Sequence, residues 1–325
     1  MPLWKRSSPE EIQRRQQEQQ DDEASRQSLE RGGLPLKARR RLGAEMEAGH
    51  PLFTSDLSTK EFLLTSELGY RPLSQVMGSS IYQVGWQYTR GYTWDTQLME
   101  MNTLSEAHQH AASLALNRLE QEATLLGAHG VVGVRFTRRN YEWGTNLIEY
   151  TAIGTAIRLS KTPQPARPFL SDLSGQEFWT LLQAGYYPSG VVTGYCSYYV
   201  ALGSQLTQQI QGWWAGAGNQ EIRPFTQGLY NARHLAMQRA TSMARKQQAL
   251  GIVGMHIENN RQVSEYETDN PARKFMDLYV HFAVLGTSII SVKKDHVIPK
   301  PVPTLTLTDL RPGRYGQNQE LTFRE

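Results

Sequence analysis

The feature that most constrains this chain is an internal repeat of a helix followed by a strand. In the first half, an alanine-striped helix leads through Leu126-Gly127 into the compact strand 131–136. In the second half, a helix with alanines at similar spacing leads through Leu250-Gly251 into the strand 252–255. Two copies of one helix-to-strand unit predict two copies of one domain.

The repeat extends over most of both halves. Twelve residues of the first half have the same residue type 116 positions later, in the series from Phe169 to Tyr198. They are Phe53, Asp56, Leu57, Ser58, Glu61, Phe62, Gly69, Tyr70, Pro72, Val76, Gly78 and Tyr82. The spacing grows to 121 between Gly133 and Gly254, and to 132 between Gly154 and Gly286. The second copy therefore carries insertions, which we expect in loops near the long helix and around Asn270-Pro271.

Local patterns predict the elements of each copy. Ser58 and Glu61 form a capping-box pattern that opens a helix ending at Gly69. A strand is expected at 76–84, a long helix from about Leu104, and further strands at 131–138, 147–159 and 278–284. We predict the α+β class, with a small antiparallel sheet packed against one long helix in each copy.

Proline and composition set the domain boundaries. Three prolines in 161–168 mark a linker between a first domain at 51–160 and a second at 169–293. The segment 294–325 is Pro-rich and is expected to be a flexible tail, in which 305–308 could add a strand to the sheet edge of a partner.

Residues 1–50 form a polar N-terminal arm. Ser8-Pro9-Glu10-Glu11 is a helix start, and the helix should end at Gly32-Gly33. The basic cluster Arg39, Arg40 and Arg41 could contact an anionic partner such as nucleic acid or lipid. The arm shows no continuous apolar stripe, so we interpret it as solvated, partly helical and partly disordered.

Composition narrows the classes of function. With 325 residues, 39% hydrophobic and 20% charged, the chain has the composition of a soluble globular protein. The net charge of +3 disfavours nucleic-acid binding, and the single cysteine, Cys196, excludes an intrachain disulfide. No signal-peptide pattern and no run of about 18 apolar residues is present, so we expect a cytoplasmic protein.

The two copies resemble the YbjQ-like family, which is labelled a heavy-metal-binding domain. The first copy carries the resemblance in Leu126-Gly127-Ala128, in 131–134 and in Gly154-Thr155-Ala156. The second copy carries it in 190–194, Trp213-Trp214-Ala215-Gly216, Leu250-Gly251, Val253-Gly254 and Gly286-Thr287. The resemblance implies a ring-like homo-oligomer, pentameric in single-domain members. Tandem copies would supply two ring positions for each chain, unless each copy builds its own ring. Open sheet edges in such small domains point the same way, because neighbours must cover them.

Metal ligation is weakly supported by the residues. The heavy-metal label transfers poorly, since the chain has no Cys-x-x-Cys and no cluster of cysteine with histidine. His108 and His110 diverge on one helix and would need ligands from another subunit. His256 and His281 lie on expected strands, as core, interface or ligand residues. Cys196 is expected to be buried. We predict no cofactor, and leave a divalent metal open.

Tryptophans in glycine-containing segments are the candidate interaction residues. Trp86 and Trp94 follow the first strand, and Trp213 and Trp214 are adjacent, so they cannot both face one core. They suit contact with a partner or a membrane surface, the alternative being packing between repeats or subunits. The segment 127–133 is not a phosphate loop, because it follows a helix and opens a strand.

We therefore predict a non-catalytic oligomeric scaffold whose tandem domains build the ring and whose terminal arms recruit another protein. The alternative is a metal- or small-molecule-binding protein with sites at repeat or subunit junctions. An enzyme is disfavoured, since Asp56 and Asp172 match between the copies but only precede capping boxes.

Overall fold

A computed structural model describes residues 9–47, 52–85, 95–140, 147–160, 162–211, 219–267 and 274–291. The chain divides into a unit Met1–Val292 and a unit Lys293–Glu325. The second unit, with the predicted strand at 305–308, lies outside the described residues, as do Trp86, Trp94, Trp213 and Trp214.

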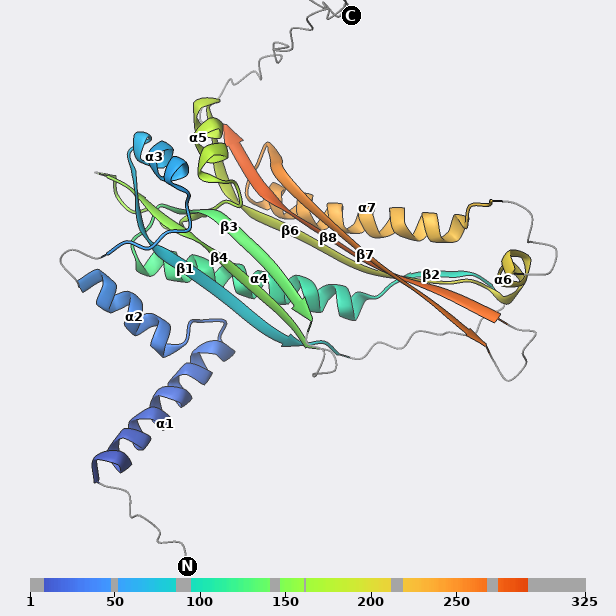
Figure 1. The fold of residues 1–325 in the computed structure, drawn as a ribbon, viewed down its shortest axis with the longest axis horizontal. Helices are drawn as coiled ribbons and strands as arrows, with labels where there is room; N and C mark the ends of the chain where they lie inside the picture. Colours follow the sequence, from blue (N-terminus) through green and yellow to red (C-terminus); the bar gives the residue numbers. More distant parts are fainter. Residues whose placement is uncertain are drawn as a thin grey trace, which may run out of the picture. The chain divides into compact units, whose positions relative to one another are not determined.

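The first unit is an α+β fold with two four-stranded sheets (Figure 1). Its elements follow in the order α1 (Pro9–Glu30), α2 (Leu36–Glu47), α3 (Thr59–Glu67), β1 (Tyr70–Gln83), β2 (Gln97–Glu100), α4 (Asn102–Leu125), β3 (Gly130–Asn140), β4 (Leu147–Leu159), β5 (Phe169–Leu170), α5 (Gly175–Gln183), β6 (Tyr186–Ala201), α6 (Ser204–Gln211), α7 (Arg223–Lys246), β7 (Gly251–Glu267) and β8 (Lys274–Ser291). No helix in the described ranges is long and apolar enough to cross a membrane.

The two sheets exchange one strand each. Sheet A has the order β1-β4-β3-β5, and sheet B has the order β2-β6-β8-β7. Pairing is antiparallel except between β3 and β5. β5 belongs to the predicted second domain and β2 to the first, so neither predicted domain builds its sheet alone. The reason is physical: each short strand covers an edge that would otherwise expose unpaired backbone groups.

Each long helix lies against a glycine in the first long strand of its half, β1 or β6. A Cβ on Gly78 would lie 2.0 Å from the carbonyl oxygen of Ala115, and a Cβ on Gly194 would lie 2.0 Å from that of Ala236. Glycine is therefore required at both positions, because any side chain would push the helix away. The alanine stripe that the sequence shows on each helix allows this close approach.

The layers alternate as sheet A, α4, sheet B and α7. On β6, residues 193, 195 and 197 face α4, whereas Cys196 and Tyr198 pack with the alanines of α7. The other side of α4 packs against sheet A through residues such as Ala115 and Leu119. Helix α4 is thus enclosed between two sheets, whereas the described residues place a sheet on one side of α7 only.

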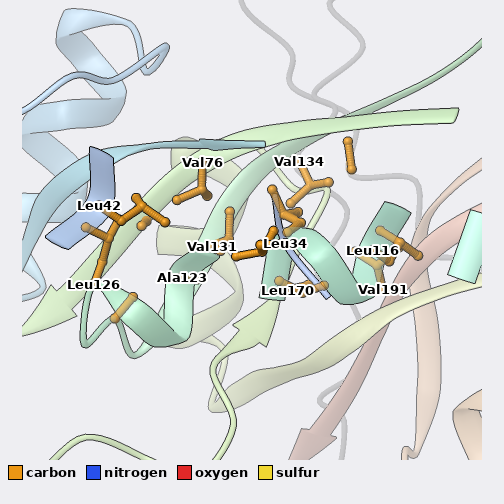
Figure 2. Packing of buried hydrophobic residues seen from close by; sticks show 14 residues of the cluster. Leu34, Leu42, Val76, Leu116, Ala123, Leu126, Val131, Val134, Leu170 and Val191 are labelled. Atoms are coloured by element: carbon orange, nitrogen blue, oxygen red, sulfur yellow. The ribbon is translucent and has the colours of Figure 1, made fainter. Parts of the chain in front are cut away.

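One apolar cluster joins three parts of the chain around α4 (Figure 2). It includes Leu34 and Leu42 from the N-terminal arm, and Leu170 and Val191 from the second half. The helix predicted from Pro9 is present as α1 with mostly exposed side chains, but the later part of the arm packs on α4. Leu42 is fully buried, because α2 places it on α4, a contact that no stripe in the arm's own sequence indicates.

Local signals in the sequence are confirmed at several element ends. Ser58 and Ser174 each form a capping box, with Glu61 and Glu177 respectively. The helix at Gly69 ends as predicted, with a positive φ of 82°. Cys196 is buried, as expected. Strands β1, β7 and β8 are longer than predicted.

Candidate functional site at the junction between the two halves

The edge of β6 is completed by the first half of the chain. β2 pairs with the end of β6, and the Met101 N–H donates to the Ser197 carbonyl at 2.8 Å. The hydroxyl of Ser105 accepts from the Ser197 N–H at 2.9 Å, and the Gln109 side-chain carbonyl accepts from the Tyr195 N–H at 3.3 Å. The first turns of α4 therefore satisfy backbone groups that an edge strand would leave unpaired.

The edge of β3 is completed by the second half in return. The Ser171 N–H donates to the Val131 carbonyl, the Val134 N–H donates to the Ser171 carbonyl, and the Gly133 N–H donates to the Leu173 carbonyl, each at 2.9 Å. We call these two sets of contacts, together with the side chains between them, the junction. It joins the halves by backbone pairing in both directions.

A buried polar and aromatic cluster lies inside the junction. The ring of His108 stacks on Tyr195 with centroids 5.5 Å apart, and its Nδ1 lies 2.8 Å from the Tyr150 hydroxyl. The ring of His281 lies 6.2 Å from that of His108, and its Nδ1 lies 2.9 Å from the Ser197 hydroxyl. We call His108, Tyr150, Tyr195 and His281 the junction cluster.

Burial holds the junction cluster in its uncharged form. It lowers the pKa of His108 to about 3, with the charge of Arg138 and the proximity of His281 adding to the shift. Burial also lowers the pKa of His281 and raises that of Tyr195 to about 12. At neutral pH both imidazoles are neutral and both phenols are protonated, which suits packing and hydrogen bonding rather than proton transfer.

One ion pair joins the two halves, and a second pair within each half has a different cationic partner. In the junction, the Arg239 guanidinium lies 2.6 Å from the Glu100 carboxylate. In the first half, Arg135 lies 3.5 Å from Asp56, but the matching pair in the second half joins His256 and Asp172 at 3.9 Å. Burial raises the pKa of Asp172, whose Oδ1 accepts from the Thr287 hydroxyl.

A groove of about 450 Å³ opens beside the junction cluster between β3 and β7. Its lining combines aromatic, cationic and acidic groups, including Phe136, Arg138, Asp172, Tyr195 and His256. A groove of this size and chemistry can hold a small polar molecule with an apolar part.

The described residues do not fit a heavy-metal site. Within the described ranges, no group of three or more His, Cys, Asp or Glu side chains is placed to hold an ion. His108 and His281 come together but supply only two nitrogens, and each already has a partner for Nδ1. Cys196 is buried on the α7 side of sheet B, and burial raises the pKa of its thiol to about 12. Soft-metal sites use three or four thiolate or imidazole ligands.

The remaining predicted residues are dispersed. His110 is exposed and packs its ring against Tyr82, with centroids 5.5 Å apart. Arg39 donates to the Ser28 hydroxyl at 3.1 Å, Arg40 pairs with Asp21, and Arg41 reaches the buried Glu122 at 3.0 Å. All three arginines therefore hold the arm to itself or to α4.

Sequence reasoning missed the junction residues Ser105, Gln109, Tyr150 and Tyr195. The repeat contains a signal for one of them. Gln109 stands where α7 has Tyr230, and beside it His108 stands where α7 has Leu229, so polar residues replace less polar ones on one face of the helix.

The fold and the junction define an α+β protein in which two similar halves complete each other's sheets. Residues 98–160, which run from β2 to the end of β4, match the YbjQ family, described as "Putative heavy-metal-binding". No solved structure matches the chain significantly.

Over 212 residues the chain is 39% identical to the encapsulin nanocompartment protein Rv1762c of Mycobacterium tuberculosis (strain ATCC 25618 / H37Rv). The matched region covers 63% of this chain and 77% of that protein. The chain therefore belongs to the same family as this mycobacterial protein.

Proposed function

We propose that the protein is a non-catalytic subunit of a protein assembly, in which copies associate head to tail by repeating the junction between chains. Its two halves are two YbjQ-like copies, and closure of the series gives a ring, with a pentameric arrangement as one form. The arm and the C-terminal tail recruit a further protein. The cytoplasmic location stays a prediction.

One observation carries this proposal: each surface that the junction covers has a counterpart in the other half of the chain, and that counterpart is exposed. The segment 169–173 pairs with β3, but its counterpart 53–57 has no such pairing within the described residues. Accordingly Phe53 is 47% exposed, whereas the matching Phe169 is 6% exposed. The open counterpart of the β3 edge is β7, where Leu250 is 69% exposed and the matching His129 is 6% exposed.

An open edge beside exposed apolar side chains is a template for strand pairing. The edge 251–255 of one copy and the segment 53–57 of another have the residue spacing that 130–134 and 169–173 use within the chain. The direction is heterologous, so the contact can repeat until a ring closes.

The mycobacterial relative supports an assembly role, because its name places it in an encapsulin nanocompartment. The uncharged junction cluster supports a non-catalytic role. The pKa of His108 is about 3 and that of Tyr195 is about 12, whereas a general acid or base works best with a pKa near the working pH.

Native mass spectrometry of the untagged full chain tests the proposal, with Leu250→Asp as the interface variant. Leu250 is exposed, so the substitution should leave the fold intact while placing a charge in the proposed contact. We expect a closed oligomer for the parent chain and monomers for the variant.

Val263→Asp is the matched control, since Val263 is an exposed apolar residue of β7, the strand that Leu250 immediately precedes, and lies beyond the proposed contact at 251–255. It should assemble like the parent. A parent chain that remains monomeric over the whole concentration range would exclude the assembly role.

A second function is favoured by the groove between β3 and β7. Arg138, His256 and Tyr195 could hold a small anionic or phenolic molecule there. A stoichiometric added mass on the native protein, lost in Arg138→Ala but kept in Arg139→Ala, would support this ligand-binding role.

A further inference from the structure

One face of α4 is buried, whereas the matching face of α7 is exposed and forms a candidate docking surface. In α4, Ser105, His108 and Ala112 are buried against sheet B. Their counterparts, 121 positions later, are Thr226, Leu229 and Arg233, which are half-exposed or exposed. Next to them Tyr230, the counterpart of Gln109, is 65% exposed.

Sheet A carries the matching receiving surface. Within the chain, α4 covers Thr193, Tyr195 and Ser197 of β6, and all three are buried. The residues 116 positions earlier are Met77, Ser79 and Ile81 of β1. Met77 is 47% exposed and Ile81 is 61% exposed, so β1 presents two apolar side chains on this face that no described residue covers.

Charge gives the register between the two surfaces. In the junction, Glu100 pairs with Arg239 at 2.6 Å, and Arg239 also donates to the Tyr195 carbonyl. The counterparts of this pair are Glu221, at the start of α7, and Arg118, on α4. Arg118 donates to the Ser79 carbonyl at 2.6 Å, which repeats the Arg239 contact with Tyr195.

Among the described residues, none places a carboxylate on Arg118 as Glu100 does on Arg239. The N-terminal arm supplies two carbonyls instead, from Gly33 at 3.2 Å and from Leu29 at 3.4 Å. Burial lowers the pKa of Arg118, which marks an incompletely compensated guanidinium. Glu221 is exposed.

We propose that the outward face of α7 in one copy docks on the outer face of sheet A in a second copy, with Glu221 pairing with Arg118. Tyr230 then lies over Met77 and Ser79, as Gln109 lies over Thr193 and Tyr195 within the chain. The carboxylate takes the place of the Leu29 carbonyl, so the turn after α1 yields at Arg118 when the second copy binds. The inference rests on the proposed function and names its contact residues.

A charge exchange in the full chain tests the pair. Glu221→Arg alone should weaken self-association at least tenfold in sedimentation equilibrium, because two cations then meet in the contact. Arg118→Glu should weaken it similarly, and the double variant should recover most of the lost affinity. Glu67→Arg, at an exposed position of α3, makes the same charge change and should have no effect.

A cross-link keeps the test decisive where Arg118→Glu fails to fold. Chains carrying Met77→Cys and chains carrying Tyr230→Cys, when mixed, should form cross-linked dimers with a short bismaleimide, and neither should do so alone. Cys196 is buried and serves as the unreactive background.

The outcomes separate the two proposals. If Leu250→Asp abolishes assembly but Glu221→Arg does not change it and no cross-link forms, the chain self-assembles by another docking mode and this inference is wrong. If the parent chain never associates, the proposed function itself fails.

Discussion

Helices α4 and α7 have the same length and the same glycine-and-alanine contact with their own sheets, yet their surroundings differ. α4 is enclosed by sheet A and sheet B, whereas one face of α7 is open in the described part of the chain. The sequence of the helix alone does not determine how much of its surface is buried. Burial depends on whether a second half packs against the helix, and α4 has such a neighbour within the chain.

The largest effect should come from giving α4 a residue that α7 carries. Ala112→Arg places an unpaired cation in a fully buried position and should cost about 4 kcal/mol of unfolding free energy. Arg233→Ala, the reverse change at the matching position, should stay within about 0.5 kcal/mol. Urea denaturation at low protein concentration measures both. Equal costs would show that the two faces do not differ in burial.

The contact that the helices share should respond equally in both halves. Gly78→Ala and Gly194→Ala each place a Cβ against a helix carbonyl and should cost about 3 kcal/mol. Thermal melting of the two variants gives the comparison. A small cost at one position alone would mean that its helix can shift away, and that the two contacts are not equivalent.

Acid should act on α4 through His108, which α7 replaces by Leu229. The folded pKa of about 3 lies below the ordinary value of 6.5, so only the unfolded chain takes up this proton between those values. Stability is therefore complete above pH 6.5 and falls as the pH drops below it, by about 2 kcal/mol between pH 7 and pH 5.

His108→Leu should flatten this part of the profile of stability against pH. His110→Leu, two residues further along α4 on its exposed side, should leave the slope as it is. A parent profile that is flat from pH 7 to pH 5 would contradict a neutral His108.

The smallest expected effect concerns the short helices that precede β1 and β6. Ser58→Ala and Ser174→Ala each remove a capping box and should cost about 1 kcal/mol. Thermal melting should give similar values for both, with Ser66→Ala, at an exposed site, as the control. Very different costs would indicate that one cap is supported by tertiary contacts.

Much of each half could be predicted because its signals are local. The capping residues, the alanine spacing and the matched glycines predict α3, α4, β3 and β4 close to their observed bounds. Strand exchange could not be predicted in this way, because the pairing of β2 with β6 joins residues about 100 positions apart and depends on which edge is open.

The candidate site was only partly accessible to sequence reasoning, for a reason visible in β1 and β6. The buried set contains Thr193 and Ser197, whereas the exposed set contains Met77 and Ile81. The buried residues of this face are thus polar and the exposed ones are apolar, which is the reverse of the usual relation between polarity and burial. The sequence presents His108 as a candidate ligand and His281 as a core, interface or ligand residue. The enclosure that keeps His108 neutral includes Tyr150 and Tyr195, which no local pattern links to it.

The exchange of β2 and β5 also bears on the order in which the chain matures during synthesis. When the ribosome has released β4, the first half has all of its own residues but an uncovered β3 edge, and β2 has no strand to join. Both edges close only after β6 has emerged, about 40 residues later. The nascent first half therefore passes through a stage with exposed pairing groups, which is the stage at which two growing chains could pair with each other.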